Sequence, residues 1–484
     1  MRKRVTRRPG PFARLLQPFQ RLKAHASGWL ERHGSAAFWL RVLRLGLFQF
    51  GMGLTLAPIT GTLNRVLIDN MRIPAVLVGL LIAIHYFVSP VRALIGFRSD
   101  QQRAKGRWRT PYIVLGAILT FGGLNTSGFS LVLLSGKGSL PYLPALIICL
   151  LIFLAYGIGV NVLETAYLAL VSDLTPPKER GRVLAVLWMM LVLGTIASSV
   201  LLGSLLVNYS DERLISILQS SALIFLILSV VSLWNQERLR PDGTVVGYHD
   251  QVRVRMSLGQ SLALLWHQQV LRRLFAILFL ATAAFASHDI LLEPYGGQVL
   301  HMSISATTGL TALWGLAMLV AIPAAGWLLW RGFSPVLPIM LGSAVGALGF
   351  LVVAIASDAS MITPFRSGVW LIGMGRGLFI VGSLALVMAL TDRSHAGLFL
   401  GLWGVMQALA QGLGAVGGGL ARDLAERQTG SVVLGYTAVY GTAMFGLLIA
   451  LLLVVAMRLT RLRADSAVSP WQGLQDIPAD QIMY

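Results

Sequence analysis

Long apolar stretches alternate with short polar ones along most of the chain. Each apolar run is about as long as the roughly 20 residues that an α-helix needs to cross a bilayer. A first set comprises Leu43–Leu63, Val76–Gly96, Tyr112–Leu134, Leu143–Val171, Val183–Val207 and Leu214–Trp234. A second set comprises Leu274–Tyr295, Ser305–Trp330, Val336–Ile355, Gly368–Leu390, Leu398–Leu420 and Val433–Met457. The pattern therefore predicts an all-α membrane protein with about twelve transmembrane helices in two six-helix halves.

The composition agrees with a protein built for lipid. Of the 484 residues, 56% are hydrophobic and only 12% are charged, whereas a soluble domain carries about 25% charged residues. The 39 Lys and Arg against 20 Asp and Glu give a formal net charge of +19, which on a soluble protein would suggest nucleic acid. Because these basic residues cluster between the apolar runs, membrane topology explains them better, and we expect no nucleic-acid partner.

The basic residues also predict how the chain is oriented. They gather in the N-terminal arm, the loop 98–109, the segment Lys178–Arg182, the central loop and the segment after the last run. All of these fall on one side of an even number of helices, so the positive-inside rule places both termini in the cytoplasm. The predicted divisions are a basic amphipathic N-terminal segment (1–42), a first half (43–235), a cytoplasmic central loop (236–273), a second half (274–458) and a cytoplasmic tail (459–484).

The segment 287–297 is unusual for a membrane helix, because it contains His288, Asp289 and Glu293. On a continuous helix Asp289 and Glu293 would share a face, one turn apart. Pro294 and the glycines that follow it predict that helical geometry ends there. A charge in hydrocarbon costs roughly 2.5–3.5 kcal/mol on insertion scales, so such groups normally face a cavity or a partner. The alternative is that these carboxylates are solvated at the water interface, near the end of the span.

Few other polar side chains fall inside the predicted spans, and they are His85, Arg92, Asn161, Glu164, Arg376, Gln407 and Gln411. Glu164 is the deepest acid, so it needs a cation, a proton or a cavity, and Arg376 is a candidate partner. A neutral, hydrogen-bonded Glu164 is the alternative. His85 and His288 are candidate ligands for a metal, including the magnesium of a chlorophyll, although a single membrane histidine more often packs and hydrogen-bonds. The sequence shows no nucleotide-binding loop, hydrolytic constellation, redox motif or Cys/His metal cluster, which disfavours an enzyme or an ATP-driven pump.

Four stretches together resemble a known family: Gly61–Val66, Pro90–Asp100, Leu291–Gly297 and Ala396–Gly404. From about Leu43 to Met457 the chain resembles the PucC/LhaA group of light-harvesting complex assembly factors, also called the bacteriochlorophyll delivery family of the major facilitator superfamily. The loop after the second run also resembles the superfamily signature, at Gly96, Asp100, Arg103, Gly106 and Arg107. The resemblance implies a gating loop there, in which Asp100 latches one conformational state.

The resemblance implies a major facilitator fold in a photosynthetic membrane, whether intracytoplasmic, thylakoid or plasma membrane. It implies a non-enzymatic assembly factor that binds chlorophyll or bacteriochlorophyll or delivers it to light-harvesting antenna polypeptides, with a chlorophyll synthase as a further candidate partner. The candidate pigment- or substrate-binding residues are His85, Asn161, Glu164, His288, Asp289, Glu293, Tyr295 and Arg376. Among them, Asp289, Glu293 and Tyr295 are candidates for hydrogen bonds to the edge of the macrocycle, with His288 as a candidate axial ligand.

Two other functions remain open at this point. The first is a proton-coupled secondary transporter of a tetrapyrrole or another small solute, working through Glu164 or Glu293. The second is a pigment-free assembly scaffold that binds partner helices through small-residue faces such as Gly412, Gly414 and Gly417. The sequence does not choose between chlorophyll and bacteriochlorophyll.

Overall fold

The structure is a computed structural model, and it describes residues 34–92, 95, 109–135, 140–175, 180–236, 269–389 and 396–457. The predicted gating loop from Gly96 to Arg107, most of the central loop and the C-terminal tail lie outside these residues. All regular structure in the described part is helical. Eight helices within it are long and apolar enough to cross a membrane.

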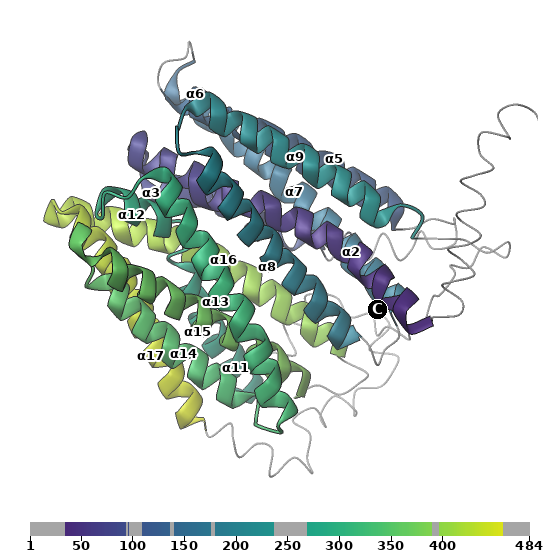
Figure 1. Cartoon of the computed structure of the whole chain (residues 1–484). Helices are drawn as coiled ribbons and strands as arrows, with labels where there is room; N and C mark the ends of the chain where they lie inside the picture. The colour runs from purple at the N-terminus through teal and green to yellow at the C-terminus, as the bar shows by residue number, and fades with distance from the viewer. Residues whose placement is uncertain are drawn as a thin grey trace, which may run out of the picture.

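The helices follow the predicted apolar runs. The first half holds α2 (Gly34–Leu56), α3 (Ala75–Phe87), α5 (Thr110–Ser127), the short α6 (Ser130–Leu134), α7 (Tyr142–Leu174), α8 (Arg180–Leu205) and α9 (Asp211–Leu233). The second holds α11 (Gln269–Ala286), α13 (Ile304–Trp330), α14 (Val336–Ala354), the 3₁₀ turn η4 (Ala359–Met361), α15 (Ile362–Ala389), α16 (Ala396–Thr429) and α17 (Val432–Ala456). Helices of the first half, purple to teal, pack beside those of the second half, green to yellow (Figure 1). The prediction of an all-α membrane protein with a major facilitator architecture is confirmed.

The two halves meet along two helix pairs, α8 against α13 and α3 against α16. Glycines allow this close approach. A side chain at Gly419 of α16 would overlap the backbone of Ala75 in α3, and one at Gly79 of α3 would overlap Ile290 of the second half. The halves therefore touch backbone to backbone at this end of α3, which leaves no room there for a bound molecule.

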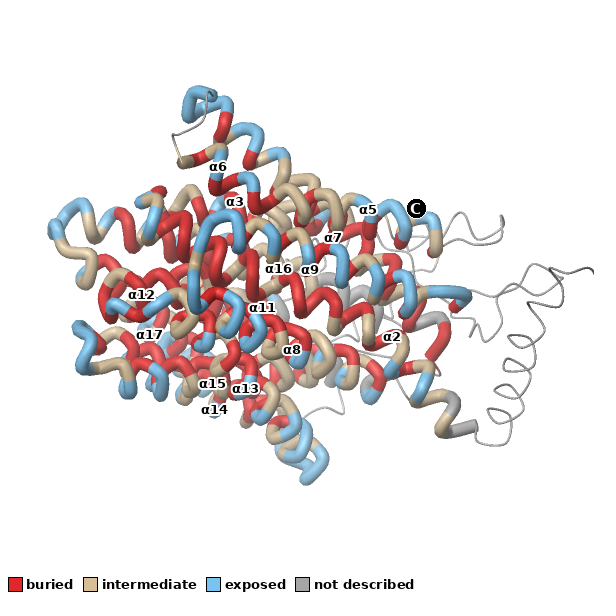
Figure 2. Tube along the Cα trace, turned by 45° about the horizontal axis from the view of Figure 1, so that its top comes forward, coloured by how far each residue is buried: buried red, intermediate tan, exposed pale blue. Residues whose placement is uncertain are grey.

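The outer faces of the bundle are apolar. Exposed residues follow the outside of the helices while buried residues line the interior (Figure 2). The exposed set includes Leu143 of α7, Leu201 of α8 and Leu452 of α17, each more than half exposed. A large exposed apolar surface is unfavourable in water but suits lipid tails. The chain is a multi-pass membrane protein.

The first spanning helix changes its geometry towards the end of the bundle away from Gly34 and Ala456. There α2 continues into two π-helical segments, η1 (Ala57–Leu63) and η2 (Val66–Asn70). A π-helical turn frees backbone groups and often marks a functional site. Here it brings the polar residues at the end of the first apolar run against the second half.

The seventh spanning helix is broken at the same end. The chain passes from α11 through turns and re-forms a short helix, α12 (Leu292–Gln298). The break therefore precedes Pro294, and the prediction that Pro294 and the glycines end the helix is wrong. Pro294 lies in the first turn of α12, where its missing N–H is tolerated. The glycines serve close packing instead, because a side chain at Gly297 would overlap Arg65 and Asp69.

Candidate functional site

The break between α11 and α12 separates the two carboxylates of this segment. Asp289 lies in the turns, whereas Glu293 lies in the first turn of α12. The prediction that the two share a helix face is therefore wrong. The side chain of Asp289 is 26% exposed, and Glu293 is 2% exposed. The two acids thus lie in different environments and need separate explanations.

Asp289 forms an ion pair within the second half. Arg376 of α15 donates from Nη1 to Asp289 Oδ1 at 2.5 Å. The guanidinium of Arg376 also lies 5.3 Å from the ring centroid of Trp314 in α13. The short distance and partial burial make this a charge-assisted bond that neutralises both groups inside the membrane.

A second ion pair lies in the first half. Arg92 donates from Nη2 to Glu164 Oε2 at 2.7 Å and from Nε to Asn161 Oδ1 at 2.5 Å. Asn161 in turn donates to the carbonyl of His85 at 2.7 Å. The candidate pairing of Glu164 with Arg376 is not formed, because each of them has a partner in its own half.

Both ion pairs have members close to Tyr86 of α3. Tyr86 is within electrostatic range of Glu164 in the first half and of Asp289 and Arg376 in the second. The side chains of Arg92 and Glu164 are 36% and 22% exposed. The structure therefore brings most of the sequence-predicted polar residues into one region between the halves, and several of them remain accessible.

The two histidines differ in accessibility. His288 is 2% exposed, and its ring lies 5.3 Å from Phe350 and 6.3 Å from Tyr440. His85 is only half-buried, and its ring lies 3.8 Å from that of Tyr86. In both, Nδ1 donates to the carbonyl three residues earlier, which leaves Nε2 as the nitrogen able to ligate a metal. His288 is thus a packing residue in this conformation, and His85 is the accessible histidine.

Tyr295 is also enclosed. It is fully buried, its ring stacks on that of Tyr436 at 4.6 Å, and its hydroxyl donates to the carbonyl of Ala356 at 2.5 Å. Because its hydroxyl is bonded and the residue is 0% exposed, it offers nothing to a ligand in this conformation.

Glu293 belongs to the contact between the halves. Its Oε1 accepts from Thr311 of α13 at 2.7 Å. Its Oε2 is buried and has no hydrogen-bond partner among the described residues. Gly61 of η1 lies directly opposite, and a side chain at that position would overlap the carboxylate. The acid is therefore held between the two halves rather than on a surface.

Arg65 and Asn64 complete this contact. Arg65 is 5% exposed, and it donates to Thr307 Oγ1 at 2.5 Å and to the carbonyl of Met302 at 2.8 Å. Asn64 donates to the carbonyl of Ile290. Sequence reasoning used these two residues only for the family resemblance and missed their role. The available signal was two strongly polar residues directly after an apolar run.

Further polar bonds join the halves at the same end. Asp423 of α16 accepts from the backbone N–H of Val76 at 2.9 Å, and Ser305 of α13 donates to the carbonyl of Gly203 at 2.5 Å. Together with the bonds of Asn64 and Arg65 and the packing of Gly61 against Glu293, we call these contacts the inter-half seal. Bonds between the halves hold this arrangement of the two halves in preference to others.

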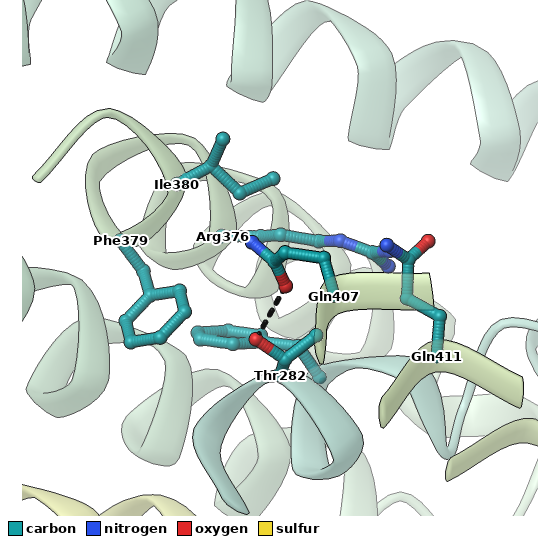
Figure 3. A pocket seen from close by; sticks show the side chains of 7 residues that line it. Thr282, Arg376, Phe379, Ile380, Gln407 and Gln411 are labelled. Carbon is teal, nitrogen blue, oxygen red and sulfur yellow. Dashed lines mark hydrogen bonds between the residues drawn. The ribbon is translucent and has the colours of Figure 1, made fainter. Parts of the chain in front are cut away.

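A small pocket lies next to Arg376, between α11, α15 and α16. It is lined by Thr282, Phe285, Arg376, Phe379, Ile380, Gln407 and Gln411 (Figure 3). Its cavity volume is about 10 Å³, which corresponds to about one water molecule. Thr282 donates to Gln407 Oε1 at 2.6 Å across one side of it. The pocket is far too small for a tetrapyrrole ring.

Comparison with known proteins gives a consistent result. The family model described as "PUCC protein" matches residues 62–462. Protein PucC of Rhodovulum sulfidophilum is 35% identical over 395 residues, which cover 79% of this chain and 85% of that protein. The protein named "Bacteriochlorophyll synthase 44.5 kDa chain" of Rhodobacter capsulatus is 30% identical over 398 residues, which cover 80% of this chain and 88% of that protein.

Solved structures are similar in fold. A bacterial homolog of the human lysosomal transporter Spinster, in an inward-facing conformation, aligns with a TM-score of 0.62 at 14% identity and covers 88% of this chain and 96% of that one. A bacterial homologue of the iron transporter ferroportin, also inward-facing, aligns with a TM-score of 0.62 at 14% identity and covers 86% and 97%. At such identity the likeness concerns the fold alone.

Proposed function

Since this chain belongs to the PUCC protein family, we propose that it is a light-harvesting complex assembly factor that binds (bacterio)chlorophyll and delivers it to antenna polypeptides. The observation that carries the proposal is the family match over nearly the whole membrane domain. The name of the Rhodobacter capsulatus relative, a bacteriochlorophyll synthase chain, supports the choice of pigment and suggests a synthase as a partner. In this proposal the protein acts without covalent chemistry in a photosynthetic membrane, with both termini in the cytoplasm.

The structure supports a pigment contact at the accessible polar residues between the halves. Arg92 with Glu164 and Arg376 with Asp289 offer charge-assisted bonds, and each pair is electrically neutral. An amphiphilic pigment needs such a neutral, polar point inside an otherwise apolar wall. His85 is the proposed axial ligand, because its side chain is only half-buried whereas His288 is 2% exposed.

Glu293, His288 and Tyr295 take no part in pigment binding in this refined proposal. All three are enclosed, and Glu293 and Tyr295 are bonded to neighbouring helices. Glu293 packs against Gly61 in the inter-half seal, whereas His288 and Tyr295 pack within the second half. The predicted gating loop at Gly96, Asp100, Arg103, Gly106 and Arg107 remains a proposal, in which Asp100 would latch the cytoplasmic end.

A proton-coupled transporter of a tetrapyrrole is the second candidate. The observation that favours it is the inter-half seal, because its bonds lie at the end of the bundle away from Gly34 and Ala456. A fold sealed at one end can bind a ligand from the other and then reverse, as alternating access requires. A scaffold that only gathers partner helices has no need for such a seal.

The test is an absorption spectrum of the protein purified in mild detergent from photosynthetic membranes. We expect near-stoichiometric (bacterio)chlorophyll in the wild type and loss of the pigment in His85→Leu, with pigment retained in His288→Phe. A colourless wild type that still co-purifies with antenna polypeptides would overturn pigment binding and favour the scaffold. A colourless protein without antenna polypeptides that shows proton-dependent flux in vesicles would favour the transporter.

A further inference from the structure

The pocket beside Arg376 has the size of a single oxygen atom rather than of a ligand. Its volume of about 10 Å³ is close to that of one water molecule. Gln407 and Gln411 project from successive turns of α16 towards Arg376 of α15, and Thr282 of α11 lies beneath them (Figure 3). Of these, only Arg376 has a role in the pigment contact described above.

This pocket has more hydrogen-bond donors than acceptors. Arg376 carries five N–H donors, and the bond to Asp289 is the one that the described residues show for it. Gln407 accepts from Thr282 through Oε1, while its amide N–H groups have no acceptor among the described residues. Gln411, only half-buried, forms no hydrogen bond with any described residue. These N–H groups are not fully buried, so they are accessible donors for a ligand atom that accepts hydrogen bonds.

The charge of the pocket is already balanced. Asp289 lies 2.5 Å from Arg376 and compensates the guanidinium. A carboxylate or phosphate on the ligand would bring an uncompensated negative charge into the membrane interior, which is unfavourable. A neutral carbonyl oxygen accepts the same hydrogen bonds without that cost. Phe285, Phe379 and Ile380 form the apolar part of the wall, which suits an apolar body attached to such an oxygen.

We propose that this pocket is a subsite for one neutral carbonyl oxygen of an apolar macrocycle, bound by N–H groups of Arg376, Gln407 and Gln411. The proposal rests on the pigment-binding function, and it names the part of the pigment that is recognised. Chlorophylls present ketone and ester carbonyls at the edge of the ring and carry no charged group, which matches the subsite. The ring itself lies outside the pocket, because the pocket has room for only about one oxygen atom.

Titration of the purified full-length protein with bacteriochlorophyll a in detergent tests the proposal. Binding is followed by absorption, and the carbonyl stretching bands are recorded by resonance Raman spectroscopy. We expect one carbonyl band of the bound pigment to lie at the lower frequency of a hydrogen-bonded group. In Gln411→Leu and Gln407→Leu that band should return towards the free frequency, and affinity should fall roughly three- to tenfold, as expected for one neutral hydrogen bond.

Gln219→Leu is the matched control, because Gln219 lies half-buried on α9 (Asp211–Leu233), away from the pocket. It should change neither the band nor the affinity. If Gln407→Leu fails to fold, Gln411→Leu alone tests the proposal. Its folding should be unaffected, since Gln411 forms no hydrogen bond with any described residue. Bound pigment whose carbonyl bands are unchanged in both variants would overturn the subsite and leave pigment binding standing. A wild type that binds no pigment would overturn both proposals.

Discussion

The inter-half seal and the ion pairs between the halves use the same kinds of residues for different purposes. In the seal, Arg65 is 5% exposed and bonds a hydroxyl and a carbonyl of the opposite half. Between the halves, Arg92 is 36% exposed and bonds an acid of its own half. The difference is whether a polar group joins the halves or neutralises a charge within one of them.

The comparison indicates that the inter-half seal stabilises the folded protein, whereas the two ion pairs are available for binding. Bonds across the halves are buried, so losing one leaves an unsatisfied partner in the interior. The side chains of Arg92 and Glu164 are 36% and 22% exposed. Those of Arg376 and Asp289 are 10% and 26% exposed, and Arg376 has N–H groups without a described acceptor. We therefore expect changes in the seal to alter stability and conformation, and changes at the ion pairs to alter pigment binding. Four predictions test this division, from the largest expected effect to the smallest.

The largest effect is expected for Arg65→Met. The change removes the bonds to Thr307 and to the Met302 carbonyl and leaves Asp69 without its cation at 3.5 Å. Breaking a buried charged contact typically costs about 3–5 kcal/mol. Thermal unfolding in detergent should show a clear loss of stability. Arg213→Met is the control, since Arg213 is exposed and bonds the Asn208 carbonyl in its own half. Equal unfolding temperatures for the two variants would contradict the role of Arg65.

Asp289→Asn should lower the amount of pigment that co-purifies with the protein. The amide oxygen can still accept from Arg376, but the negative charge is lost, so Arg376 carries an uncompensated charge next to the proposed subsite. Pigment content of the purified protein should fall roughly tenfold or more, with a smaller change in unfolding temperature than in Arg65→Met. Absorption at constant protein concentration measures it, with the exposed Asp211→Asn as the control. Pigment content that stays normal while stability collapses would assign Asp289 to the seal instead.

Gly61→Ala tests the fit of the seal around Glu293. The added methyl group would overlap Glu293 Oε1, and overpacking of this kind costs about 1–3 kcal/mol. Unfolding temperature should fall, and a second change, Glu293→Ala, should restore part of the loss by making room. Gly326→Ala in α13 is the matched control, because a side chain there meets no atom within 4 Å. If the double variant is no more stable than Gly61→Ala, overlap with Glu293 is not the cause of the lost stability.

Tyr295→Phe should have the smallest effect. The change keeps the ring stacked on Tyr436 and removes only the hydroxyl bonds to the carbonyls of Ala356 and Val353. We expect a loss of about 0.5–1.5 kcal/mol in the free energy of unfolding and unchanged pigment content. Reduced pigment content at normal stability would contradict this prediction and indicate that the Tyr295 hydroxyl contacts the pigment.

The sequence predicted the fold well and the local geometry of the site less well. Apolar runs of sufficient length predicted the spanning helices, and the structure confirms the architecture. The same pattern could not locate the break in the seventh helix, because Pro294 is compatible with a helix's first turn as well as with its end. The error put Asp289 and Glu293 on one face and so assigned them one role.

The length and polarity of the apolar runs, and hence the helical membrane fold, were determined by the sequence alone. Each helix satisfies its own backbone bonds, so a local stretch is enough to specify it in lipid. The pairing of the charges was decided only by the tertiary structure. Arg92 and Glu164 are 72 positions apart, and Asp289 and Arg376 are 87 apart. Which of these charges meet depends on how distant helices pack and rotate, and periodicity along one helix carries no information about that.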